Sequence, residues 1–101
     1  MKQKVYISGK MRGDPDFRER FTKAAEVLYE IGMWPVNPAE YYNKPPFGYP
    51  YLLLIDLWAL SQCSAIYMLK GWEDSPGAKA EKAFAEAIGL TVMYEGGETE
   101  W

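Results

Sequence analysis

The chain has 101 residues, 49% of them hydrophobic and 16% aromatic, and it carries a net charge of −3 at pH 7. These values predict one domain, residues 1–101, with one packed core, and the acidic balance excludes nucleic-acid polymers as expected partners. The sequence has one cysteine and no histidine, so neither an intramolecular disulfide nor a zinc site is expected. It shows no signal-peptide pattern and no apolar run near the ~18 residues that span a membrane. These features predict a cytoplasmic protein without membrane attachment.

Strand and helix patterns alternate along the first half of the chain. Lys4 to Ser8 predicts a strand, and residues 14–31 predict a helix that Gly32 stops. Met33 to Val36 predicts a short strand, which its proline makes either an edge strand or an irregular one. A loop rich in proline and tyrosine follows at residues 37–50, and it is either a packed surface loop or a cover for a ligand.

The second half of the chain repeats this alternation. Helices are expected at Tyr51 to Gln62 and Ser75 to Ile88, and strands at Ala65 to Leu69 and Leu90 to Tyr94. The polar tail ends in Trp101, whose ring is either frayed or docked onto a second subunit. Alternating strands and helices require crossover connections, so the sequence predicts an α/β fold with a parallel sheet between two layers of helices.

Two glycine-containing loops follow the first and third predicted strands. They are Ser8-Gly9-Lys10-Met11-Arg12-Gly13 and Gly71-Trp72-Glu73-Asp74-Ser75-Pro76-Gly77. Ligands bind beyond the carboxyl ends of parallel strands, so we expect these loops to face each other across a crevice. Lys10 and Arg12 favour a small anionic ligand there, although glycines and cations of this kind also occur in plain turns.

The last predicted helix begins with features typical of a ligand-binding helix N-terminus. The Ser75 hydroxyl can cap the free backbone N–H groups, and Pro76 suits the first helical position. Gly77 allows a ligand to approach the backbone next to Ala78. Such a terminus attracts anions and polar ligands.

Two acidic residues are predicted to lie on apolar helix faces. The helical neighbours of Glu81 are Gly77, Ala78, Phe84 and Ala85, and those of Asp56 are Leu52, Leu53, Ala59 and Leu60. An ionised carboxylate there is costly unless it is paired or faces a polar cavity. Either the two acids share a site, or each is satisfied separately by backbone N–H groups or a tyrosine.

A pair of carboxylates without metal ligands or a nucleophilic triad favours glycosidic-bond chemistry. One carboxylate attacks the anomeric carbon, and the second manages a proton or a hydroxyl. Tyr6, on the first strand, can hydrogen-bond the attacking carboxylate and fix its rotamer, or it is an ordinary core tyrosine.

The chain resembles the nucleoside 2-deoxyribosyltransferase superfamily, and within it a branch of small bacterial and phage proteins. The resemblance covers nearly the whole chain. Its motifs are Val5-Tyr6-Ile7-Ser8-Gly9 with Arg12-Gly13, Val36-Asn37-Pro38, Asp56-Leu57 ahead of Cys63-Ser64-Ala65-Ile66, and residues 71–78 followed by Glu81.

The resemblance implies a flavodoxin-like or Rossmann-like three-layer sandwich with a small parallel sheet of four to five strands. It implies enzymes that cleave the N-glycosidic bond of 2-deoxynucleosides or their monophosphates. Glu81 then corresponds to the nucleophile, Tyr6 to the residue that orients it, and Asp56 to the acid that contacts the sugar or assists the departing base. Substrate contacts are expected from Ser8, Gly9, Lys10, Met11, Arg12, Gly13, Asn37, Ser75, Gly77 and Ala78.

The leading hypothesis from the sequence is therefore cleavage or transfer at the N-glycosidic bond of a (deoxy)nucleoside or its 5'-monophosphate. The alternatives are a non-catalytic nucleotide-binding module and, less favoured, a structural partner protein. No cofactor or metal is expected, because carboxylate chemistry requires none. The resemblance also implies a homo-oligomer, at least a dimer.

Overall fold

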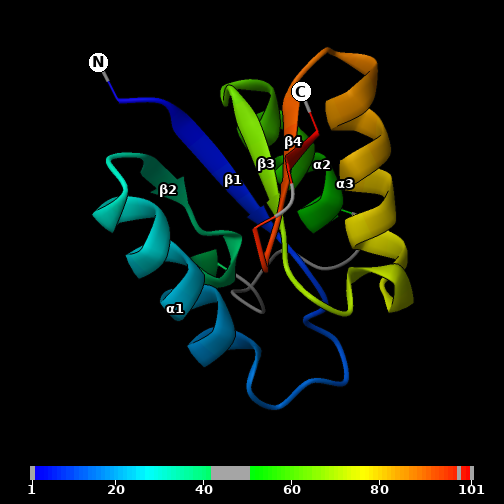
Figure 1. Ribbon diagram of the computed structural model, residues 1–101. Coiled ribbons are helices and arrows are strands. Elements are labelled where there is room, and N and C mark those ends of the chain that lie inside the picture. The colour runs from blue at the N-terminus through cyan, green and yellow to red at the C-terminus, as the bar shows by residue number, and fades with distance from the viewer. Residues whose placement is uncertain (1, 42–50, 98, 101) are drawn as a thin grey trace.

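A computed structural model describes residues 2–41, 51–97 and 99–100 as three layers, with a central sheet between helices (Figure 1). The sheet has the order β2-β1-β3-β4-β5, in which β1 to β4 are parallel and β5 is antiparallel to β4. The strands are β1 (Lys4–Ser8), β2 (Trp34–Val36), β3 (Ala65–Met68), β4 (Thr91–Tyr94) and β5 (Thr99–Glu100). The helices are α1 (Phe17–Glu30), α2 (Tyr51–Ser61) and α3 (Pro76–Ala87), with 3-10 turns η1 (Pro38–Tyr41) and η2 (Trp72–Asp74). This is a small α/β Rossmann-like fold.

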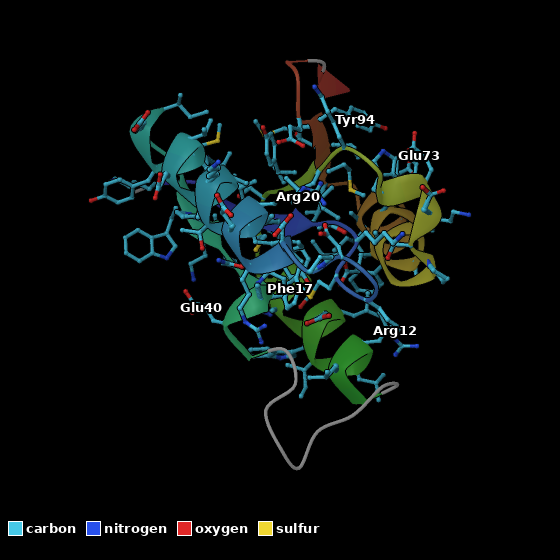
Figure 2. All side chains as sticks on the ribbon, turned by 90° about the horizontal axis from the view of Figure 1, so that it is seen from below. Arg12, Phe17, Arg20, Glu40, Glu73 and Tyr94 are labelled. Atoms are coloured by element: carbon cyan, nitrogen blue, oxygen red, sulfur yellow. The ribbon has the colours of Figure 1, made fainter. Side chains whose placement is uncertain are left out.

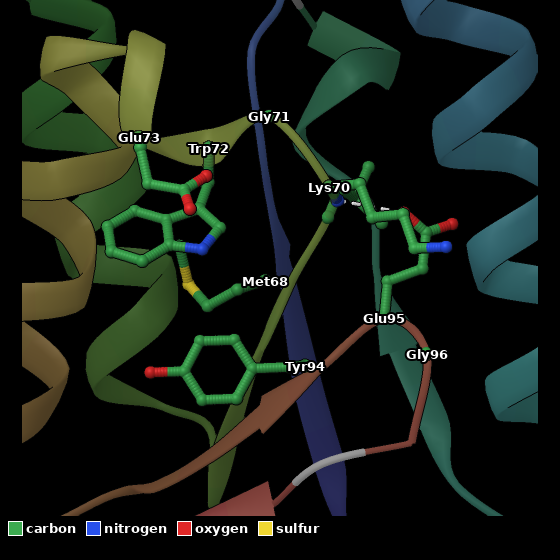
Figure 3. Close-up of a pocket in the computed structure, with 9 residues that line it drawn as sticks. Met68, Lys70, Gly71, Trp72, Glu73, Tyr94, Glu95 and Gly96 are labelled. Carbon is green, nitrogen blue, oxygen red and sulfur yellow. Dashed lines mark hydrogen bonds between the residues drawn. The ribbon is translucent and has the colours of Figure 1, made fainter.

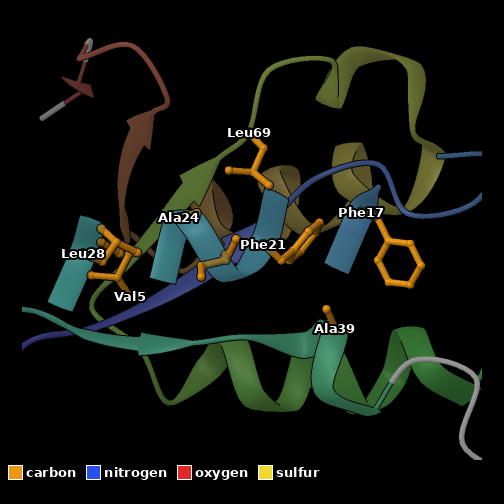
Figure 4. Packing of buried hydrophobic residues seen from close by; sticks show 9 residues of the cluster. Val5, Phe17, Phe21, Ala24, Leu28, Ala39 and Leu69 are labelled. Carbon is orange, nitrogen blue, oxygen red and sulfur yellow. The ribbon is translucent and has the colours of Figure 1, made fainter. Parts of the chain in front are cut away.

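Side-chain alternation in β1 divides the core between the two faces of the sheet. Val5 and Ile7 pack on the face that α1 covers, against a stripe of α1 side chains (Figure 4). That stripe repeats at helical spacing and consists of Phe17, Phe21, Ala24 and Leu28. Tyr6 and Ser8 therefore point to the opposite face, where Tyr6 joins a second cluster with residues of α2 and α3.

The position of β1 in the sheet places the switch in strand order at its carboxyl end. β1 pairs with β2 on one side and with β3 on the other. The first connection therefore leads from β1 to its neighbour on one side, and the next leads from β2 to the neighbour on the opposite side of β1. The strand order reverses at this point, which is where open parallel sheets bind ligands. Ser8 is the last residue of β1 and pairs with Met68 of β3.

Local polar groups set the beginning of two helices. The Asp14 carboxylate accepts hydrogen bonds from the Asp16 backbone N–H at 2.9 Å and from Arg20 at 2.6 Å. These bonds hold residues 14–16 in a turn, so α1 begins at Phe17 instead of residue 14. The Ser75 hydroxyl accepts a bond from the Ala78 N–H at 3.1 Å, which confirms the predicted cap of α3.

The order and type of the elements confirm the predicted fold class, with differences at the ends of the sheet. β5 was not predicted, because residues 95–101 contain two glycines and three glutamates and lack an apolar alternation. Most of the loop at residues 37–50, together with Trp101, lies outside the described residues. In the described part of the chain, no helix has both the length and the apolar character needed to cross a membrane.

The α1 stripe offers a direct test of this packing. Leu28 is fully buried and its neighbour Val27 is exposed. We expect Leu28→Ala to lower the free energy of unfolding by about 2–5 kcal/mol, because it leaves a cavity between α1 and the sheet. Val27→Ala should change it by about 0.5 kcal/mol or less. Urea denaturation of both variants measures the difference, and equal losses would contradict the orientation of α1.

Candidate functional site

Glu81 is a buried acid in the middle of the second core face. Its side chain is 6% exposed and both carboxylate oxygens accept hydrogen bonds from hydroxyl groups of β1. Tyr6 donates to Oε2 at 2.7 Å, and Ser8 donates to Oε1 at 2.6 Å. Two donors at fixed positions hold the carboxylate in one orientation, which is a property of a positioned reactive group.

The sequence places these three side chains together through two simple periodicities. Tyr6 and Ser8 are two residues apart in a strand, so they point to the same face. Glu81 lies on the second turn of α3, whose start is fixed by Ser75, and it follows the buried Ala78 at helical spacing. Sequence reasoning expected the contact with Tyr6 but assigned Ser8 to the substrate; the spacing of two residues was the signal for its contact with Glu81.

Asp56 of α2 completes the group of acids and changes the ionisation of Glu81. The pKa of Glu81 is raised from 4.5 to about 8, first by burial and further by electrostatic repulsion from Asp56 and a side-chain hydrogen bond with it. The hydrogen bonds from Ser8 and Tyr6 act in the opposite direction, because they favour the ionised carboxylate. The structure thus brings the two predicted acids into contact, and this contact favours the protonated form of Glu81.

The start of α3 presents the predicted anion-binding features on the carboxyl edge of the sheet. Ser75 and Gly77 are both partly exposed, and a Cβ placed on Gly77 would approach only the Ser75 hydroxyl, at 3.9 Å. The Ala78 methyl group is buried in the core, and its N–H donates a hydrogen bond to Ser75. Ala78 therefore contributes to packing and to the helix cap.

The loop after β1 combines packing residues with two cations. Gly9 is buried, and a Cβ there would lie 2.9 Å from the Cβ of Leu69, so glycine permits the close approach to the chain after β3. Met11 packs against the α1 face of the core. Lys10 is partly exposed and Arg12 is exposed. Figure 2 shows the Arg12 side chain at the outside of the molecule.

Arg20 ties this loop to the loop after β3. Its guanidinium donates to the Asp14 carboxylate at 2.6 Å and to the Lys70 carbonyl at 2.7 Å. The Leu69 N–H also donates to the Ser8 carbonyl at 2.9 Å. Both loops therefore lie at the same edge of the sheet, as expected, although the contribution of Arg20 was missed because it lies on α1, outside any glycine-containing motif.

Asn37 and Gly13 have local structural roles. The Asn37 side-chain oxygen accepts a hydrogen bond from the Ala39 N–H at 3.0 Å, which caps η1. Gly13 has φ +82°, a conformation that favours glycine. Among residues 2–41, 51–97 and 99–100, no three histidine, cysteine, aspartate or glutamate side chains are grouped so that they could hold a metal ion.

Comparison with known proteins assigns a family. The model of a family described as "Domain of unknown function (DUF4406)" matches residues 3–94. The chain belongs to this family. A search of curated proteins found no match. The residues of DUF4406 matched here include Tyr6, Asp56 and Glu81, so the acid pair lies within the family's domain.

The raised pKa of Glu81 predicts a pH-dependent stability. The folded protein binds the Glu81 proton more tightly than the unfolded chain, so stability falls as pH rises from about 4.5 to about 8. The slope for one proton is about 1.4 kcal/mol per pH unit. We expect Glu81→Gln to remove this component, because glutamine does not ionise.

Urea denaturation of both proteins between pH 5 and pH 9 measures the effect. The free energy of unfolding of the wild type should fall more steeply with pH than that of Glu81→Gln. Parallel curves would show that Glu81 titrates near its ordinary value, contrary to its burial next to Asp56.

Proposed function

We propose that this protein cleaves or transfers at the N-glycosidic bond of a (deoxy)nucleoside or its 5'-monophosphate, with Glu81 as nucleophile. The observation that carries the proposal is the buried Glu81 carboxylate, oriented by Tyr6 and Ser8 and hydrogen-bonded to Asp56. Perturbed and coupled carboxyl groups at the carboxyl edge of a parallel sheet are typical of active sites. The sequence resemblance to nucleoside 2-deoxyribosyltransferases supports the same reaction.

The first step uses the proton that the two acids share. Glu81 attacks the anomeric carbon as a carboxylate, and the bond to the base nitrogen breaks with its electron pair on that nitrogen. Asp56, holding the proton at that moment, donates it to the departing base. The hydrogen bonds from Tyr6 and Ser8 favour the ionised form of Glu81 and so assist the transfer of the proton to Asp56.

The second step regenerates the enzyme. The Asp56 carboxylate accepts a proton from water, whose oxygen attacks the anomeric carbon and displaces Glu81; a second base in place of water gives transfer. Direct attack by water without an ester requires carboxyl groups about 6.5–9.5 Å apart. A side-chain hydrogen bond joins Asp56 and Glu81, so the two groups lie closer than this range, and the covalent route is the one we propose.

The charge at the edge of the sheet supports a substrate with a phosphate group. Lys10 and Arg12 lie on the loop after β1, and the N-terminus of α3 begins at Ser75 on the same edge. A helix N-terminus and nearby cations both favour an anion. The same groups support a nucleotide-binding module without turnover, which is the second candidate function.

Base release tests the assignment of the nucleophile. Purified wild type should release free base from at least one member of a panel of deoxynucleosides and their 5'-monophosphates, as measured by chromatography. Glu81→Ala should lower the rate by about a thousandfold or more, because the covalent route is lost. Glu86→Ala, on the exposed side of the same helix, is the matched control and should retain the rate.

Two outcomes would contradict the proposal in different ways. Unchanged release by a folded Glu81→Ala variant would remove Glu81 from the mechanism. No release from any substrate, with or without a second base as acceptor, would exclude the enzyme and leave the binding module. In that case a 5'-monophosphate should raise the melting temperature of the protein and be recovered chemically unchanged.

The outer face of α2 supports the expected homo-oligomer. Leu54 and Trp58 lie one helical turn apart and are 64% and 69% exposed, and Asp56 is the one charged residue of this helix. An uncharged face of this kind is complementary to the same face of a second copy in a two-fold dimer.

The cytoplasmic location expected from the sequence also stays a prediction.

The dimer is tested by light scattering during size-exclusion chromatography. Trp58→Glu should convert the dimer to a monomer, because it places a charge in the contact between the two α2 helices. Ile88→Glu introduces the same charge at another exposed apolar position and should leave the dimer intact. A monomeric wild type would refute the proposal.

A further inference from the structure

A groove of about 700 Å³ opens at the carboxyl ends of β3 and β4, outside the group formed by Glu81, Tyr6 and Ser8 (Figure 3). Its volume lies within the range of small-molecule sites. The residues that line it come from the ends of the two strands and the turns after them, and they are Met68, Leu69, Lys70, Gly71, Trp72, Glu73, Tyr94, Glu95 and Gly96. Sequence reasoning did not identify this groove.

Strand register places the groove beside the Glu81 group. Ser8, Met68 and Tyr94 are paired in sequence across β1, β3 and β4, so they form one row on the sheet. Neighbouring strands are about 4.8 Å apart, which puts Tyr94 two strand spacings from Ser8. Met68 is 1% exposed and lies between them, so the groove is separate from the acid pair.

One side of the groove is aromatic and held in place from behind. The rings of Trp72 and Tyr94 have centroids 6.4 Å apart and planes inclined by 39°. Lys82 of α3 places its ammonium group 5.4 Å from the Trp72 centroid. Burial lowers the pKa of Lys82, but its hydrogen bonds with Glu86 and Tyr94 outweigh burial and raise it. Lys82 also bonds Glu86 at 3.1 Å, so the aromatic side is fixed before a ligand arrives.

The other side of the groove and its rim are polar and slightly acidic. Glu95 Oε1 accepts a hydrogen bond from the Lys70 N–H at 2.8 Å, which fixes the Glu95 side chain at the groove (Figure 3). Glu73 is exposed and lies on the turn that carries Trp72. The lining thus carries the carboxylates of Glu73 and Glu95 and the ammonium group of Lys70. This excess of negative charge favours a ligand with N–H donors and disfavours an anion.

We propose that this groove is a second binding site for a planar heteroaromatic ring that bears an amino group and no phosphate, such as a free aminated nucleobase. The ring stacks on Trp72 and Tyr94, and its N–H groups donate to Glu73 and Glu95. The anionic substrate proposed above and the ligand of this groove thus differ in charge. The groove site does not depend on glycosidic chemistry at Glu81.

Calorimetric titration with adenine tests this site in the full chain. Adenine should bind, hypoxanthine should bind at least fivefold more weakly because a carbonyl replaces its amino group, and a 5'-monophosphate should not compete for the groove. Trp72→Ala should weaken adenine binding at least tenfold, and Glu95→Gln at least threefold. Trp34→Ala removes a ring of another exposed pair and should have no effect.

Variants of the acid pair distinguish this proposal from the proposed function. Glu81→Gln should abolish base release and leave adenine binding unchanged. Adenine binding that Trp72→Ala and Glu95→Gln leave unchanged, or no binding by the wild type, would overturn the groove proposal. Trp72→Phe keeps an aromatic ring and should retain most of the affinity, so a loss of folding in Trp72→Ala does not prevent the test.

Discussion

The hydrogen bonds that Tyr6 and Ser8 donate to Glu81 are the interactions on which the second face of the sheet depends. A carboxyl group that is 6% exposed loses most of its hydration, and it is tolerated only where other groups replace the lost water. Two hydroxyls of β1 and the side chain of Asp56 supply those contacts. The buried acid therefore fixes how α3 lies on β1, and it constrains α2 through Asp56.

The central position of β1 in the sheet explains why this strand carries the two hydroxyl groups that hold the Glu81 carboxylate. β1 has neighbours on both sides, so its backbone is held by two ladders and its side chains keep fixed directions. A rigid strand can hold donors at 2.6 Å and 2.7 Å from a carboxylate without help from a loop. The more exposed loops at the edge of the sheet then supply charge, as Lys10 and Arg12 do.

The sequence predicts the elements that have a clear periodicity and the residues that violate it. Glu81 and Asp56 could be identified because every helical neighbour is apolar or glycine, and Tyr6 because it alternates in a strand. β5 could not be predicted, since its pairing with β4 gives a polar segment a structure that its composition does not favour. The groove next to Tyr94 depends on the register between β3 and β4, which a single sequence does not reveal.

Several residues that the sequence assigns to the site also have local structural roles. Ser8 is expected to contact the substrate, and its hydroxyl donates a hydrogen bond to Glu81. Asn37 and Ala78 were expected at the site, and their polar groups complete the caps of η1 and α3. In each case the structure adds a hydrogen bond within the protein that the motif alone did not indicate.

The central position of β1 has a consequence for how the chain is made. A ribosome synthesises β1 before β2 and long before β3, which begins at Ala65. The nascent chain must therefore carry an apolar strand with an unpaired side until more than half of the protein has emerged. Its buried hydroxyls meet their acid partner only after residue 81, so the sheet and the acid pair are completed late and together during synthesis.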